Sequence, residues 1–184
     1  MKYILASASP RRREILSSLD FDFEVITSDV DESSDITEPS ALVCELSRRK
    51  ALAVRDAMHD NNRIIIACDT VVALNDQILG KPVDEADARN MLRDLSGDMH
   101  SVYSGLCLIK GNKIKCDFCC TDVYFDRLDK DDIDRYIASD EWTDKAGAYG
   151  IQGKAGMFVK KIDGCYFNVV GLPINLLKNM LKEF

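Results

Sequence analysis

The first part of the chain alternates between short strand-like runs and a strong helix-start signal. Residues 2–6 are apolar and residues 21–27 alternate between apolar and polar positions, so both ranges predict strands. Between them, Ser9 and Pro10 favour a helix start, because serine can cap free N–H groups and proline fits the first helical position. We expect this helix to run to about Leu19.

The middle of the chain predicts a loop, a long helix and a buried strand. Residues 28–38 are polar and acidic, as in a loop, and residues 39–59 have helical periodicity. Apolar positions of that helix include Leu42, Leu46, Ala53 and Ala57. Residues 64–67 are mostly β-branched and predict a buried strand. Residues 71–74 either continue this strand or form a returning strand beside it.

A hairpin signal opens the second half of the chain. Residues 102–109 and 114–125 have the composition of long strands, and Gly111-Asn112 between them is a two-residue turn signal. Further helices are expected at residues 84–95, with Gly97 as a stop, at residues 129–139 and at residues 173–182.

A second hairpin is expected near the end of the chain, where residues 158–162 and 166–170 flank Asp163-Gly164. Strands and helices alternate early and hairpins come late, which predicts an α/β fold with a mixed central sheet flanked by helices. The 184 residues contain no internal repeat or clear linker. We therefore expect one domain over residues 1–184, with a lobe boundary near residues 76–81.

The charge and the apolar runs exclude several partners. The formal net charge of -7 argues against nucleic acid, whose binding proteins carry basic patches. A small anionic ligand needs only a local cluster of positive groups. The first apolar stretch is too short for a signal core. The longest uncharged run, residues 164–177, is broken by Gly171 and Pro173, so we also expect no membrane partner.

Seven cysteines, an odd number, without an export signal indicate free thiols in a reducing cytoplasm. Cys116, Cys119 and Cys120 raise the question of zinc. Structural zinc takes four ligands, usually from two spaced pairs, whereas the chain has only two histidines, His59 and His100, and no second cysteine pair. The alternation around the three cysteines instead predicts a buried strand, with the thiols packed in the core.

The turn after the first strand is the first candidate for chemistry. Ser7-Ala8-Ser9-Pro10-Arg11-Arg12-Arg13 places arginines in the first turn of a helix, where they oppose the helix dipole. A helix N-terminus with arginines suits an anion such as phosphate. The alternative is a capped helix with solvated arginines.

Asp69 is the second candidate, because it lies between two apolar runs and an unpaired buried carboxylate is costly. Such a group is usually paired, metal-bound or catalytic, although an acid at a strand end can also cap a turn. Asp29, Asp31 and Glu32 in the acidic loop could join Asp69 in holding a hard cation such as Mg²⁺. The alternative is a solvated acidic loop.

Two further segments could contact a nucleotide. Lys81 stands between Gly80 and Pro82 on a turn and, with Lys50 of the long helix, could present a point charge to a phosphate; an ordinary turn is the alternative. Residues 144–153 contain three glycines and Gln152, which offers both a donor and an acceptor for a base edge. Glycine-rich turns without a function are also common.

Together, these segments resemble the Maf family of nucleotide pyrophosphatases from residue 6 to residue 173. The resemblance rests on five short motifs in this order: Ser7-Ala8-Ser9-Pro10-Arg11-Arg12, Cys68-Asp69-Thr70-Val71-Val72, Leu79-Gly80-Lys81-Pro82, Leu95-Ser96-Gly97 and Val169-Val170-Gly171-Leu172-Pro173. The chain departs from the pattern at Cys68, where relatives often carry Ser or Ala, and at Ser104, where they often carry Thr.

The resemblance implies roles for individual residues. Asp69 is implied as the catalytic base toward water. The implied specificity positions are Arg11, Thr70 and Gln152. The implied phosphate ligands are Ser7, Arg12, Lys50 and Lys81, and a Mg²⁺ or Mn²⁺ ion would be held by Glu32 and Asp69.

The resemblance also implies the wider properties of the protein. These are an ITPase-like fold with an active-site cleft between two lobes, a nucleoside triphosphate substrate and a homodimer. Residues 145–153 resemble the subgroup that hydrolyses dTTP and UTP rather than the subgroup acting on 7-methyl-GTP. The alternatives are the same reaction on a purine substrate and a nucleotide-binding regulator without turnover, although such a regulator would gain nothing from carboxylates beside phosphates.

Overall fold

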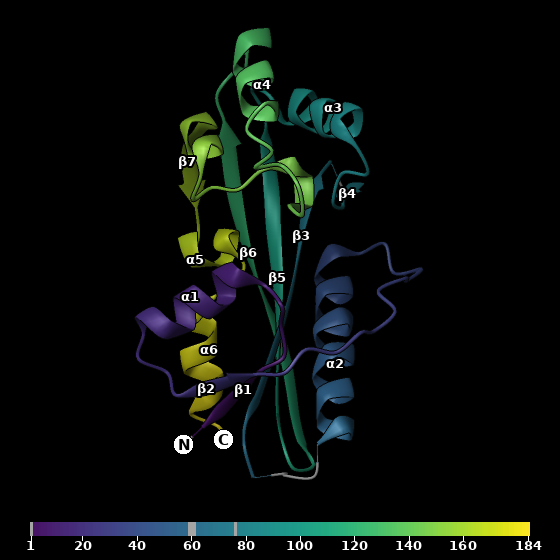
Figure 1. Ribbon diagram of the computed structural model, residues 1–184, viewed down its shortest axis with the longest axis vertical. Coiled ribbons are helices and arrows are strands. Elements are labelled where there is room, and N and C mark those ends of the chain that lie inside the picture. Colours follow the sequence, from purple (N-terminus) through teal and green to yellow (C-terminus); the bar gives the residue numbers. More distant parts are fainter. Residues whose placement is uncertain (1, 59–61, 76) are drawn as a thin grey trace.

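A mixed sheet of seven strands organises the protein (Figure 1). The computed structural model describes residues 2–58, 62–75 and 77–184, so His59 lies outside the described residues. The strands are β1 (Tyr3–Leu5), β2 (Phe23–Val25), β3 (Ile65–Leu74), β4 (Gln77–Leu79), β5 (Met99–Lys110), β6 (Lys113–Phe125) and β7 (Val159–Asp163). Their order is β2-β1-β3-β5-β6-β7, with β4 paired to β3.

Strand direction follows the connections. β1 pairs in parallel with β2 and β3, and the connections carry the helices that a parallel crossover requires. The remaining pairs are antiparallel. β5 and β6 form the expected hairpin, since Lys110 pairs with Lys113 across Gly111-Asn112. The prediction of a mixed sheet is confirmed.

Helices cover both faces of the long strands. They are α1 (Pro10–Ser18), α2 (Pro39–Ala57), α3 (Glu85–Leu95), α4 (Lys130–Ile137), α5 (Tyr166–Val170) and α6 (Ile174–Leu181), with 3-10 turns η1 (Ala146–Ala148) and η2 (Lys154–Phe158). In Figure 1, α2 lies on one side of the long strands, and α1 and α6 lie on the other. No helix of the described residues is long and apolar enough to span a membrane.

Adjacent side chains on a strand point to opposite faces of the sheet, so the core is divided into clusters on the two faces. Ile66 and Leu106 pack with α1 and α6, whereas Ile65 and Cys107 pack with α2. A third cluster lies farther along the same strands, at Val72 and Val102, with α3, α4, η1 and η2. Two lobes result, and β3, β5 and β6 run through both (Figure 1).

Two predicted elements differ in the structure. Residues 166–170 form the helix α5, so the expected hairpin at Asp163-Gly164 is wrong. The reason is tertiary: the buried Asn168 amide donates hydrogen bonds to the Val102 carbonyl and to Thr121 Oγ1, and Gly171 ends the turn with a φ of 117°. The buried residues of α2 are Val43, Leu46, Ser47, Ala51 and Val54. Of the apolar positions named for this helix, only Leu46 is buried, whereas Leu42 and Ala53 are half-buried and Ala57 is exposed.

The cysteines of β6 do not form the buried group that the alternation predicted. Cys116 and Cys119 are half-buried and Cys120 is exposed, and only Cys116 packs against the cluster beneath α2. Cross-strand partners share a face: Cys120 pairs with Tyr103, and Cys119 pairs with Ser104 on the opposite side. The three thiols therefore do not converge on one point.

Candidate active site

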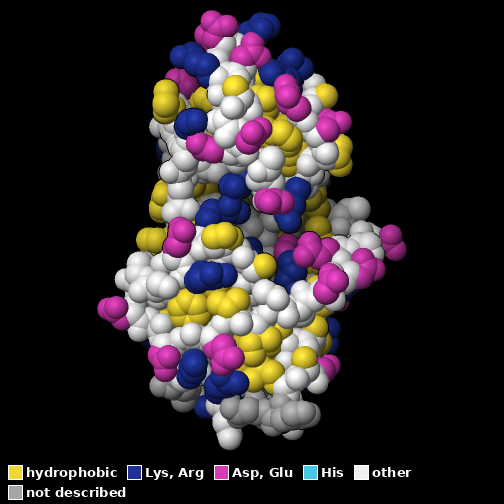
Figure 2. All heavy atoms as spheres, viewed as in Figure 1, with side chains coloured by type: hydrophobic (Ala, Val, Ile, Leu, Met, Phe, Trp, Pro, Cys, Tyr) yellow, Lys and Arg dark blue, Asp and Glu magenta, His cyan; other side chains and the backbone are white. Residues whose placement is uncertain are grey.

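A cleft of about 720 Å³ separates the two lobes, and every residue to which the resemblance gave a role lines it. Asp29 and Asp31, the other candidate cation ligands, are not among the lining residues, and the Asp31 carboxylate accepts hydrogen bonds from Ser33. Figure 2 shows the molecule hollowed at its waist, with positive and negative side chains gathered there. The lobe with α1, α2 and α6 contributes Ser7, Arg11, Arg12, Glu32 and Lys50 to the cleft, and the other lobe contributes Lys81, Asp144, Lys145 and Gln152. Asp69 and Thr70 lie on β3 between them.

Strand geometry sends Asp69 and Thr70 to different partners. Adjacent side chains on a strand point to opposite faces, so Asp69 lies on the α2 face and Thr70 lies on the face of α1 and α5. The Lys50 ammonium of α2 reaches Asp69 Oδ1 at 2.5 Å. The Arg12 guanidinium of α1 reaches Thr70 Oγ1 at 3.0 Å.

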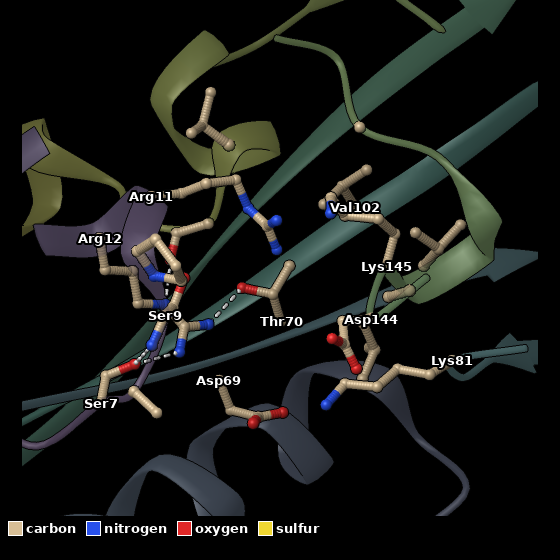
Figure 3. A pocket seen from close by; sticks show the side chains of 18 of the residues that line it. Ser7, Ser9, Arg11, Arg12, Asp69, Thr70, Lys81, Val102, Asp144 and Lys145 are labelled. Carbon is tan, nitrogen blue, oxygen red and sulfur yellow. Dashed lines mark hydrogen bonds between the residues drawn. The ribbon is translucent and has the colours of Figure 1, made fainter. Parts of the chain in front are cut away.

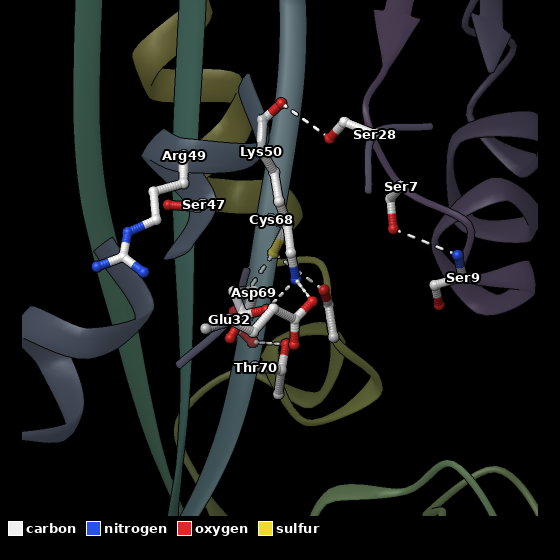
Figure 4. Close-up of polar contacts among 12 residues, drawn as sticks. Ser7, Ser9, Ser28, Glu32, Ser47, Arg49, Lys50, Cys68, Asp69 and Thr70 are labelled. Atoms are coloured by element: carbon white, nitrogen blue, oxygen red, sulfur yellow. Dashed lines mark hydrogen bonds and ion pairs between the residues drawn. The ribbon is translucent and has the colours of Figure 1, made fainter. Parts of the chain in front are cut away.

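Lys50 joins two carboxylates (Figure 4). Its Nζ lies 2.8 Å from Glu32 Oε1 and 2.5 Å from Asp69 Oδ1. Burial lowers the pKa of Lys50, but the two carboxylates outweigh burial and raise it above 10.5. Burial likewise raises the pKa of Glu32, but Lys50, Lys81 and Arg12 outweigh it, so the net pKa of Glu32 is lowered. Lys50 and Glu32 are therefore charged at neutral pH.

The turn before α1 is built around Ser7 rather than around a capping serine. Ser9 occupies the N-cap position and Pro10 the first turn, as predicted, but the Ser9 side chain caps no N–H group. Instead, the Ser9 N–H donates to Ser7 Oγ at 3.3 Å, and Arg12 Nη1 donates to the same oxygen at 3.0 Å. The expected capping by Ser9 is wrong, because this backbone donor is directed toward Ser7 beside the cleft.

Three positive side chains reach the cleft without a fixed partner (Figure 3). Among the described residues, Arg11 and Lys81 make no hydrogen bond or ion pair through their side chains, and Lys145 Nζ contacts only the Thr143 carbonyl. Burial and the neighbouring Arg12 lower the pKa of Arg11, with Asp144 opposing them. Burial and Arg11 lower the pKa of Lys145. Around Arg11, Lys81 and Lys145, the cleft therefore has more positive than negative side chains, since Asp144 is the one carboxylate named beside them.

The glycine-rich segment is anchored next to Lys81. The Gly147 N–H donates to the Gly80 carbonyl at 3.0 Å. Gly147 has a φ of 65°, which favours glycine, and a Cβ there would meet the Val72 side chain at 3.1 Å, which is a tight contact. Gln152 of the same segment is exposed and lines the cleft, where a ligand can reach its amide.

A family model described as Maf-like protein matches residues 2–184. The chain belongs to the Maf family. A Clostridium botulinum (strain Kyoto / Type A2) protein named dTTP/UTP pyrophosphatase is 52% identical over 185 residues, covering 98% of this chain and 95% of that protein. Proteins of the same name from Clostridium acetobutylicum and Clostridium tetani are 50% and 49% identical, covering 98% and 100% of this chain and 96% and 97% of theirs.

The Maf fold of this chain also has a counterpart among solved structures. The Staphylococcus aureus Ham1 protein aligns with a TM-score of 0.57 at 16% identity, covering 100% of this chain and 99% of that chain. The two proteins share a fold, as the resemblance implied.

Glu32 and Asp69 are the residues that would hold the predicted divalent cation. Glu32 and Asp69 converge on the same point, which the Lys50 ammonium contacts. Within the described residues, no group of three or more His, Cys, Asp or Glu side chains is arranged to hold a metal. Mg²⁺ commonly uses one or two carboxylates and takes its other oxygens from substrate phosphate and water. A Mg²⁺ ion at Glu32 and Asp69 would thus need its remaining ligands from substrate phosphate and water, and the metal stays a prediction.

Sequence reasoning gave no role to several polar residues of this site. Asp144 and Lys145 were named only as part of the glycine-rich segment, yet both line the cleft. Lys50 was predicted as a phosphate ligand, but its pairing with Glu32 and Asp69 was not predicted. Its place between the buried Ser47 and Ala51 of α2 is a signal of a paired charge. Ser104 was noted only as a departure from relatives, although it contacts Thr70 at 2.8 Å.

Proposed function

We propose that this chain hydrolyses dTTP and UTP to the monophosphate and pyrophosphate. The observation that carries the proposal is that positive side chains without a protein partner line the same cleft as the Asp69 carboxylate. The Arg11 guanidinium and the Lys81 ammonium have no partner among the described residues, and both line the cleft that contains Asp69. Free positive groups from two lobes beside a buried acid fit a ligand with several negative charges.

Asp69 is suited to activate water in this cleft. Its Oδ1 accepts from Lys50, whereas Oδ2 has no hydrogen bond with the described residues and is able to accept a water proton. The water oxygen bonds to the α-phosphorus, the bond to the bridging oxygen breaks, and pyrophosphate leaves. Lys81 and Arg12 offset the charge of the leaving group. A Mg²⁺ or Mn²⁺ ion held by Glu32 and Asp69 would supply further charge neutralisation.

Base selection is the role proposed for Gln152 and Arg11. Gln152 and Arg11 both line it, and Gln152 offers the donor and acceptor pair that a pyrimidine edge requires. The curated relatives at about 50% identity carry the name dTTP/UTP pyrophosphatase, which supports these two substrates.

The test incubates the protein with dTTP, UTP, CTP, GTP, ITP and 7-methyl-GTP in Mg²⁺ or Mn²⁺, and measures pyrophosphate separately from orthophosphate. We expect pyrophosphate from dTTP and UTP. Asp69→Asn should lower the rate by roughly 10²- to 10⁴-fold, the range for a general base. Addition of EDTA should stop the reaction and excess Mg²⁺ should restore it.

The other outcomes separate the alternatives. Pyrophosphate from purine substrates alone would retain the reaction but contradict the assignment of Gln152. Saturable nucleotide binding without any product would indicate a regulator instead. A cytoplasmic location and a homodimer also stay predictions. All seven cysteines are free thiols, which supports a reducing compartment, and sedimentation velocity tests the dimer.

A further inference from the structure

Arg12 is held by three acceptors from three parts of the chain. Its Nε donates to the Gly171 carbonyl at 2.8 Å, Nη1 donates to Ser7 Oγ at 3.0 Å and Nη2 donates to Thr70 Oγ1 at 3.0 Å. A guanidinium has five N–H groups, so two remain for a ligand. Because the three protein acceptors fix the plane of the guanidinium, they also fix the direction of the two free N–H groups.

The proton of the Thr70 hydroxyl can be placed from its neighbours. Ser104 is fully buried, and its Oγ donates to the Asn168 carbonyl at 3.1 Å. A carbonyl only accepts, so this bond uses the single Ser104 proton. The contact of 2.8 Å between Thr70 Oγ1 and Ser104 Oγ must then have Thr70 as the donor. Thr70 thus has no proton left for a nucleotide, and its oxygen accepts from Arg12.

Ser7 has the opposite arrangement. Its Oγ accepts from the Ser9 N–H and from Arg12 Nη1, which occupies both lone pairs. The Ser7 proton is therefore free to donate to an anion in the cleft. Of the two hydroxyls that support Arg12, one presents a proton to the ligand and the other directs its proton into the core.

The bonds around Thr70 form a closed ring. Arg12 donates to Thr70, Thr70 to Ser104, and Ser104 to the Asn168 carbonyl, which also accepts from the Gly171 N–H at 3.0 Å. The Gly171 carbonyl then accepts from Arg12. Without Ser104, the Thr70 hydroxyl would be free to turn its proton toward the guanidinium, which would displace Arg12.

We propose that Ser104 is a positioning residue for Arg12, acting through Thr70, and that Thr70 affects the substrate by orienting this phosphate-binding side chain rather than by contacting the base. The proposal rests on the proposed function only in that the ligand carries a polyphosphate. It assigns Ser104 a part in phosphate affinity and removes Thr70 from direct base selection.

The test compares Ser104→Thr with Ser104→Val, which have nearly the same shape and differ in the hydroxyl. Binding of inorganic tripolyphosphate is measured by titration calorimetry at constant Mg²⁺. We expect Ser104→Thr to bind within about twofold of wild type and Ser104→Val to bind roughly tenfold more weakly, the effect of about one lost hydrogen bond. The KM for dTTP should rise by a similar factor, with the dTTP-to-UTP preference unchanged.

A double-mutant cycle separates this role from general destabilisation. Thr70→Val alone should weaken tripolyphosphate binding, and adding Ser104→Val should weaken it no further, because both act through one bond to Arg12. Losses that multiply, or equal losses in Ser104→Thr and Ser104→Val, would overturn the proposal. If Ser104→Val does not fold, Ser104→Ala takes its place in the cycle.

The two proposals fail in different ways. Wild-type protein that binds tripolyphosphate but releases no pyrophosphate from any nucleotide would overturn the proposed function and leave the role of Ser104 testable by binding. Active wild-type protein with normal tripolyphosphate binding in Ser104→Val would overturn only the role of Ser104. Wild-type protein that binds no tripolyphosphate would overturn the inference itself.

Discussion

Lys50 and Lys81 both carry charge into the cleft, but only Lys50 is tied to the protein. Lys50 pairs with Glu32 and Asp69, and the Asp69 side chain is only 10% exposed. Lys81 is exposed and has no ion pair with the described residues. The same substitution at these two residues therefore separates support of the fold from support of the ligand.

We predict that Lys50→Met lowers the free energy of unfolding by about 1–3 kcal/mol, because it leaves the Asp69 carboxylate without its donor. Lys81→Met should change that free energy by no more than about 0.5 kcal/mol, as for an ordinary surface residue. Both variants should lose pyrophosphate release. Urea unfolding and the dTTP assay measure the two effects, and equal stability of the two variants would contradict the role of Lys50.

His100 makes stability depend on pH. It is buried between the rings of Phe125 and Tyr149, and its Nε2 is 2.8 Å from the Tyr149 hydroxyl. Burial lowers the pKa of His100 from 6.5 to about 4. Between these pH values the unfolded chain binds a proton that the folded protein does not, so stability falls as pH decreases from 6.5 toward 4.

For His100, lowering the pH from 7 to 5 should cost about 2 kcal/mol of folding free energy. His100→Gln removes this titration while every carboxylate remains, so the variant should lose about 2 kcal/mol less than wild type over the same interval. Urea unfolding at the two pH values gives the comparison. The same pH dependence in both proteins would show that His100 does not titrate as its burial requires.

The residue types of the site were predictable, whereas their hydrogen-bond directions were not. Asp69 and Arg12 stand in motifs whose chemistry indicates phosphate and water activation, and the structure brings both to one cleft. The sequence contains no signal that the Thr70 proton is committed to Ser104. That assignment depends on the Asn168 carbonyl of α5, a helix that the strand-like composition of residues 166–170 had concealed.

At the scale of elements, the position of α2 depends on one close approach. A Cβ at Gly105 of β5 would meet the Val43 carbonyl oxygen at 2.2 Å and the Cys44 nitrogen at 2.8 Å, and both of these are backbone atoms. The helix therefore rests directly on the strand. The contact brings Val43 and Cys44 against β5, and the apolar residues named from the sequence contain no signal of it.

We predict that Gly105→Ala lowers the free energy of unfolding by roughly 1–3 kcal/mol, the usual cost of overpacking. It should also reduce dTTP hydrolysis, because moving α2 away from β5 moves Lys50 away from Asp69. Gly80→Ala is the control for stability, since a Cβ there meets nothing within 4 Å. Urea unfolding of the two variants measures the difference, and equal stabilities would contradict the close approach.

At the scale of the whole molecule, the two lobes share their longest strands. β5 contributes Val102 to the cluster of one lobe and Leu106 to the cluster of the other, and β3 does the same with Val72 and Ile66. Neither lobe can unfold without removing strands from the second. The organisation thus favours a single cooperative domain with a cleft between its halves, in contrast to two domains joined by a linker.

We therefore predict that residues 1–184 unfold in one transition. Trp142, the single tryptophan of the chain, packs against the cluster that contains Val72 and Val102 and reports on that lobe. Replacing Trp142 by Phe and Phe21, which packs in the other lobe, by Trp moves the probe. Fluorescence of both proteins and their far-UV circular dichroism in urea should give coincident transitions within each protein. Separate fluorescence and dichroism midpoints in either protein would show that the lobes unfold independently. The continuous strands would then not couple the two lobes.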